Sequence, residues 1–109
     1  MLVLVDGRNV QRSRWPNVAD EELVAAVEAW AAREGHEAIV VFDGEAPDGA
    51  VGTGGESADD WIARRAAQLT ARDVPYRLVT SDRELRLRAG VAAHAVTGGG
   101  RFLSLLGLR

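Results

Sequence analysis

Three short apolar runs in this sequence lead into aspartates, and the stretches between the runs have the spacing of helices. The runs are Leu2–Val5 before Asp6-Gly7, Ala38–Phe42 before Asp43-Gly44, and Tyr76–Val79 before Thr80-Ser81-Asp82. Continuous apolar runs of this length are typical of parallel strands that are buried on both faces. Parallel strands that alternate with helices need right-handed crossovers, which place helices on both sides of the sheet. The sequence therefore predicts a three-layer α/β/α fold with a central, mostly parallel sheet of about four strands.

The helices are predicted from apolar residues at helical spacing and from signals at the helix ends. Leu23, Val27 and Trp30 share one stripe of a helix over 20–34, which Gly35 ends. Ser57 begins a second long helix that runs to about residue 72, and Ser81 is expected to cap a short helix over 83–89. A final helix is expected over 101–106 and a fourth strand over 91–96, whereas 8–17 and 45–55 are predicted as loops.

The composition excludes several classes of protein. Because the chain has no cysteine, it can form neither a disulfide framework nor a Cys-ligated zinc site. The first apolar run is too short for a signal peptide, and no run approaches the length of a membrane span. The length suits one domain over residues 1–109. We therefore expect a single-domain, cytoplasmic protein with no membrane partner.

The aspartates that follow the strands are expected to meet. In parallel α/β folds, ligands bind beyond the carboxyl ends of the strands, where Asp6, Asp43 and Asp82 would lie. Asp59 and Asp60 occupy the first turn of the second long helix, and their placement is less defined. Any one of these acids could simply be a turn or cap residue. Together they would repel one another unless a divalent cation such as Mg²⁺ neutralised them, which predicts a metal-dependent phosphodiesterase.

The net charge bears on the partner. A formal charge of −3 argues mildly against a nucleic-acid ligand, but without the five clustered aspartates 11 acids face 13 basic residues, a balance of +2. Arg8 and Arg12 after the first strand, and Arg83 after the third, are candidates for phosphate contacts, with a solvated surface as the alternative. Trp15 could stack on a base, although packing against the neighbouring helix is the favoured interpretation.

Four segments carry a resemblance to a known family. They are LVDGRNV at 4–10, VVFDG at 40–44, TGGESADDWI at 53–62 and VTSDRELR at 79–86. In this order they resemble the YacP-like NYN family, a branch of the PIN-type ribonucleases, over nearly the whole chain. The chain departs from the family at Arg8, where an aromatic residue is usual, and in its short segment over 45–53.

The resemblance implies a PIN-like (NYN) fold and an endoribonuclease that depends on Mg²⁺ or Mn²⁺. Its implied catalytic acids are Asp6, Asp43, Asp59, Asp60 and Asp82, and its implied metal ligands are Asp6, Asp43, Asp60 and Asp82, with the choice between Asp59 and Asp60 open. Asn9, Arg8, Arg12, Ser81 and Arg83 are the implied substrate-binding residues, with Asn9 orienting a ligand or phosphate and Thr80-Ser81 positioning Asp82.

RNA is accordingly the expected partner, either as mRNA or tRNA or on the ribosome, and monomer and homodimer are both open. The alternative is a weakly active or inactive RNA- or protein-binding module on the same fold. Receiver domains, related phosphatases and P-loop nucleotide binders are disfavoured because the chain contains no lysine.

Overall fold

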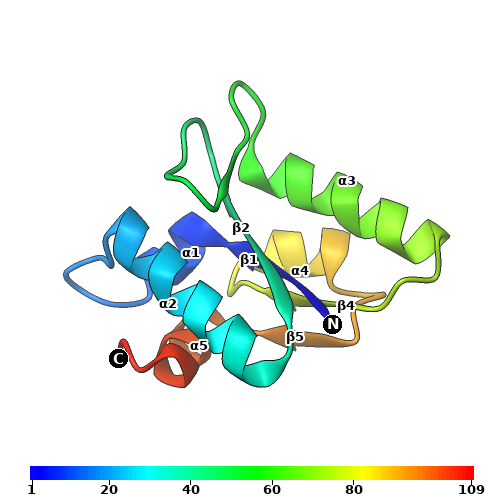
Figure 1. Ribbon diagram of the computed structural model, residues 1–109. Helices are drawn as coiled ribbons and strands as arrows, with labels where there is room; N and C mark the ends of the chain where they lie inside the picture. The colour runs from blue at the N-terminus through cyan, green and yellow to red at the C-terminus, as the bar shows by residue number, and fades with distance from the viewer.

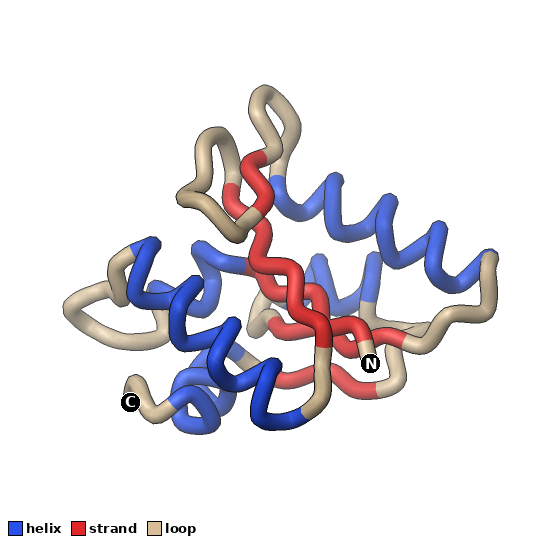
Figure 2. Tube along the Cα trace, in the orientation of Figure 1, coloured by secondary structure: helices blue, strands red, loops and turns tan.

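Five parallel strands form one sheet in the order β3-β2-β1-β4-β5, and the computed structural model describes residues 1–109. Figure 2 shows the strands running between the helices. In chain order the elements are β1 (Leu2–Asp6), α1 (Gly7–Gln11), α2 (Asp20–Glu34), β2 (Glu37–Phe42), β3 (Val51–Gly52), α3 (Ala58–Ala71), β4 (Tyr76–Val79), α4 (Arg83–Ala89), β5 (Ala95–Thr97) and α5 (Gly99–Leu106).

Helices cover both faces of the sheet, so the predicted three-layer α/β/α fold is confirmed (Figure 1). Val3 and Val5 of β1 pack in one core with α1, α2 and α5. Leu4, between them, packs in a second core with α3 and α4. This alternation follows from the two-residue repeat of a strand, and it explains why β1 is apolar at every position from Leu2 to Val5. None of the helices combines the length and the hydropathy that a membrane span requires.

Several element boundaries agree with the sequence. The observed α2 and β4 have the predicted ends, and Gly35 ends α2 in the left-handed conformation at φ 68°. Trp30 is buried in the core, where its ring meets Phe102 edge-on at 5.0 Å between centroids. Ser57 caps α3, because its side chain accepts a hydrogen bond from the Asp60 N–H.

Other predictions were wrong. Residues 7–11 form helix α1 rather than a loop, and Val10 is its one apolar residue, too few for a periodic signal. Asp82, not Ser81, caps α4, since the Asp82 side chain accepts from the Leu85 N–H. The sheet has five strands because β3 pairs with β2. The last strand begins at Ala95 instead of 91, because residues 90–93 turn back after α4. The last helix begins at Gly99, two residues before the predicted start.

Gly7 permits α1 to start directly at the end of β1. A Cβ atom at this position would lie 2.6 Å from Cε1 of Phe42 and 3.0 Å from the carbonyl oxygen of Val41. Both distances are too short for a side chain, and the Val41 oxygen belongs to the backbone of β2. The helix can therefore leave the strand this tightly only with glycine at its first position.

We expect Gly7→Ala to lower the free energy of unfolding by about 1–3 kcal/mol, because the added methyl group overpacks the contact with β2. Urea unfolding monitored by circular dichroism measures the change. Gly55→Ala is the matched control, since a Cβ there meets nothing within 4 Å. Equal stability of the two variants would contradict this account of the β1–α1 junction.

Candidate functional site

Asp6 ends the central strand β1 and is a buried acid with 6% of its surface exposed. The Thr80 hydroxyl donates a hydrogen bond of 3.0 Å to Oδ2 of Asp6, and the Asn9 backbone N–H also bonds to this side chain. Burial, together with the nearby carboxylates of Asp59 and Asp82, raises the pKa of Asp6 to about 6 against these bonds. The surroundings of Asp6 therefore move its pKa from the acidic range toward neutral pH.

Thr80 links Asp6 to the next acid. While its hydroxyl donates to Asp6, the same oxygen accepts a hydrogen bond of 3.1 Å from the Asp82 N–H. Asp82 uses Oδ1 to accept from the Leu85 N–H at 3.0 Å and so caps α4. The completely buried Thr80 thus fixes both acids at the carboxyl edge of the sheet.

Asp43 follows β2 and is joined to the start of α3. Its Oδ1 accepts a hydrogen bond of 2.5 Å from the Ala58 N–H. An acid suits this place, because the first N–H groups of a helix have no partner within the helix and carry partial positive charge. Asp43 and Asp82 therefore lie at the N-terminal ends of the two helices, α3 and α4, that cover the same face of the sheet.

Asp59 and Asp60 point in different directions from the first turn of α3. Burial raises the pKa of Asp59, and the charges of Asp82 and Asp43 add to this effect. Asp60 instead accepts a hydrogen bond of 2.8 Å from Arg88, and this bond lowers its pKa. Neighbouring helical residues differ by about 100° around the axis, so only one can face the cluster. Of the two acids between which the sequence left the choice open, Asp59 faces Asp82 and Asp43, whereas Asp60 faces Arg88.

The acids do not form a closed cage for a metal. No three His, Cys, Asp or Glu side chains lie close enough together to hold an ion between them. The chemistry of the donors nevertheless fits Mg²⁺ or Mn²⁺: they are carboxylate oxygens, and their mutual repulsion raises the pKa of Asp6 and Asp59. Mg²⁺ commonly binds through one or two carboxylates and keeps several waters. Asp6 with Asp59 or Asp82 would suffice for such a site.

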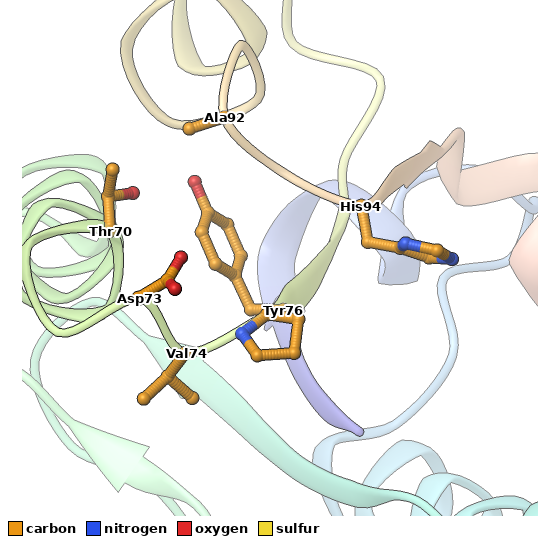
Figure 3. A pocket seen from close by; sticks show the side chains of 7 residues that line it. Thr70, Asp73, Val74, Tyr76, Ala92 and His94 are labelled. Atoms are coloured by element: carbon orange, nitrogen blue, oxygen red, sulfur yellow. The ribbon is translucent and has the colours of Figure 1, made fainter.

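The acid cluster, defined here as Asp6, Asp43, Asp59 and Asp82, extends from the buried Asp6 through the half-buried Asp59 and Asp82 to the exposed Asp43. None of the four hollows of the molecule is lined by a member of the cluster. Figure 3 shows one of them, where Asp73, Val74 and Tyr76 lie at the amino end of β4. That hollow belongs to the opposite edge of the sheet, away from the acids. A substrate of the acid cluster would therefore be a large molecule that lies across the surface.

Asn9 and Ser81 form hydrogen bonds between segments that adjoin Asp6 and Asp82. Oδ1 of Asn9 accepts from the Ser81 N–H at 2.8 Å, and Oγ of Ser81 accepts from the Gly99 N–H at 2.8 Å. These bonds connect α1, the β4–α4 loop and the start of α5. The contact of Gly99 with Asn9 could not be predicted from the sequence; a Cβ atom at Gly99 would lie 3.0 Å from Oδ1 of Asn9. Both implied substrate-binding residues thus have structural bonds.

The arginines expected to bind phosphate differ from one another. Arg8 donates to Asp20 at 2.8 Å and lies 4.9 Å from the centroid of the Phe42 ring, so its guanidinium is held on the side of α2. The guanidinium of Arg8 therefore already has an acidic partner. Arg12 and Arg83 are exposed and form no ion pair. They remain the arginines near this edge that could meet an anion.

The fold and site together define a three-layer α/β protein with an acidic cluster at the carboxyl edge of a parallel sheet. No protein-family model and no curated protein matches the sequence. Two crystal structures of Rae1 (YacP) from Bacillus subtilis are similar to it. The structure of a single-substitution mutant covers 97% of this chain and 74% of its own, with a TM-score of 0.77 and 21% identity. The other covers 98% and 74%, with a TM-score of 0.72 and 21% identity. The chain has a YacP-like fold.

We expect Asp6→Asn to stabilise the protein at pH 8 when no divalent ion is present. The folded-state pKa of Asp6 lies above the ordinary value of 3.8, so its ionisation costs stability. The cost is absent below about pH 4, grows between about pH 4 and pH 6, and levels off at about 3 kcal/mol above pH 6. Unfolding by urea at a series of pH values measures the difference between variant and wild type.

Asp60→Asn is the control for this series. The pKa of Asp60 is lowered by its bond with Arg88, so its loss should destabilise slightly at neutral pH. A gain from Asp6→Asn that does not change with pH would show that ionisation of Asp6 is not the cause.

Proposed function

We propose that this protein is an endoribonuclease that depends on Mg²⁺ or Mn²⁺ and cleaves RNA phosphodiester bonds. The observation that carries the proposal is the placement of Asp6 and Asp82 at the carboxyl edge of the sheet by the two hydrogen bonds of Thr80, with Asp59 close enough that its charge raises the pKa of Asp6. Such a cluster opposes folding and has no evident structural use as a whole. It is the donor set that hard divalent cations and phosphodiester chemistry require.

Asp6, Asp59 and Asp82 would hold the ion, and Asp43 would support the site from the start of α3. The ion would supply charge neutralisation at the phosphate and a nucleophile at neutral pH. Thr80 keeps Asp6 and Asp82 in fixed orientations through its two hydrogen bonds. The choice of RNA rests on the lack of a hollow at the acid cluster that would hold a small molecule, and on the resemblance of the sequence to the YacP-like NYN ribonucleases.

A second candidate is an RNA- or protein-binding module without catalysis. It is favoured by one observation, that no three acids converge on a metal position. The two functions differ in their response to metal. A nuclease needs the ion to act, whereas a binding module would bind its partner equally well in EDTA.

We expect Mn²⁺ or Mg²⁺ to support cleavage of single-stranded RNA and EDTA to abolish it. Asp6→Asn and Asp59→Asn should lower the rate by ~10²–10⁴-fold, because each removes a carboxylate from the reacting centre. Asp60→Asn should keep most of the activity, since Asp60 is bonded to Arg88. Cleavage of labelled RNA resolved on a denaturing gel measures all three variants.

The pair of adjacent substitutions makes this test specific. Asp59 and Asp60 lie in the same helix turn, and each substitution removes one negative charge. A difference in activity between the two variants therefore cannot come from the total charge of the protein. Thermal denaturation with and without Mn²⁺ adds a readout that does not depend on activity: the ion should raise the melting temperature of wild type and of Asp60→Asn, but not of Asp6→Asn. Full activity in Asp6→Asn would refute the nuclease assignment.

A further inference from the structure

Trp15 is the most exposed large apolar side chain of the protein, with 88% of its surface accessible. The expectation that it packs against the neighbouring helix was therefore wrong. Trp30, by contrast, is 8% exposed in the core. Burial of a large apolar side chain stabilises a fold by about 1.5–3 kcal/mol, and Trp15 contributes almost none of this. An indole held in solvent suggests a ligand that covers it.

The segment over 12–19 that carries Trp15 is fixed on both sides. On the side before Trp15, the Ser13 hydroxyl donates to the carbonyl oxygen of Asn9 at 2.9 Å. Arg14 donates to the carbonyl oxygens of Leu108 at 2.9 Å and Pro16 at 3.2 Å. After it, Val18 is buried in the core. A ring displayed from a segment held in this way loses little freedom when it binds a partner.

This segment lies on the same edge of the sheet as the acid cluster. It connects the end of α1, a helix that begins directly after Asp6, to the start of α2, and Figure 1 shows it as a loop that projects beyond these two helix ends. Asn9 in α1 is bonded to Ser81, next to Asp82. A polymer lying across the acids can therefore continue along α1 to Trp15.

A positive charge without an acidic partner lies in the same segment as Trp15. Arg8 and Arg14 are paired with Asp20 and Glu22, whereas Arg12 is exposed and has no acidic partner. Arg12 precedes Trp15 by three residues in the same segment. Proteins that bind single-stranded nucleic acid combine aromatic rings, which stack on bases, with cations that meet the backbone.

We infer that Trp15 and Arg12 form a docking element for single-stranded RNA, in which the indole stacks on an unpaired base and the guanidinium contacts a phosphate. This inference rests on the proposed function for its choice of ligand and extends it to the substrate class. A stacked base must have a free face, so the element selects unpaired RNA over duplex. Every base has such a face, and the element therefore gives little sequence preference.

Binding is best measured apart from cleavage. The parent is the Asp6→Asn protein, and each further substitution is made in it. Affinity for a short labelled single-stranded RNA is measured in EDTA by fluorescence anisotropy. We expect Trp15→Ala to weaken binding roughly 5- to 150-fold, and Trp15→Phe to restore most of the loss because a phenyl ring also stacks. Arg12→Gln should lower the slope of log affinity against log salt by about 0.7, whereas Trp15→Ala should leave this slope unchanged.

Two controls make the result interpretable. Val91→Ala removes an apolar side chain that is 83% exposed beyond the other end of α4, and it should not change RNA affinity. Duplex RNA of the same sequence should bind Trp15→Ala as it binds the parent. Because Trp15 is exposed, its loss should leave the melting temperature unchanged.

The outcomes separate this inference from the proposed function. Equal affinities of the parent and Trp15→Ala for single-stranded RNA would overturn the inference even if wild type cleaves RNA, and would leave the ring as a contact for a protein. An equal loss on duplex RNA would overturn it too. If no metal supports cleavage but Trp15→Ala and Arg12→Gln behave as expected, the docking element stands and the nuclease assignment falls.

Discussion

A buried carboxyl group at the end of the central strand is the constraint on which this site depends. Asp6 is paired with Val41 of β2 and is only 6% exposed, so water cannot easily solvate its charge. Ionised acids are rarely buried without compensation. The compensation here is the Thr80 hydroxyl and the Asn9 N–H, and it is incomplete, because the pKa of Asp6 stays at about 6. The remaining cost is the physical reason to look for a cation.

The structural and functional interpretations of the other acids are compatible. Asp82 caps α4 and Asp43 accepts from the first N–H of α3, as ordinary helix-start residues do. Each of these bonds uses Oδ1 and leaves the second oxygen without such a bond. The helix ends therefore orient the carboxylates and neutralise part of their charge. An acid used as a cap is in this sense a preorganised ligand, at little additional cost to stability.

The sheet and its long helices could be predicted because their signals are local. The apolar runs of β1, β2 and β4 and the stripe of α2 are visible in the sequence, and parallel pairing then brings Asp6, Asp43 and Asp82 to one edge. Two features could not be predicted in this way. Helix α1 has one buried apolar side chain, and β3 has two residues, so neither is long enough for a pattern. Asp59 and Asp60 are equivalent until the helix phase is known.

That phase is set by the buried stripe of α3, because Ile62, Ala66 and Leu69 follow Asp59 at helical spacing and lie on its side of the helix. Arg88, at the end of α4, meets Asp60 across the α3–α4 contact, and Arg64 meets Glu56 at the start of α3. Each is an exposed ion pair, which adds little stability by itself. Their main effect is on the electrostatic field at the surface, because each pair offsets the negative charge of one acid near the cluster. Asp59 is left without such a partner, so the charge that an approaching anion meets at this edge comes chiefly from the acid cluster itself. A divalent ion that neutralises this cluster would therefore do more to admit RNA than any change in net charge elsewhere on the protein.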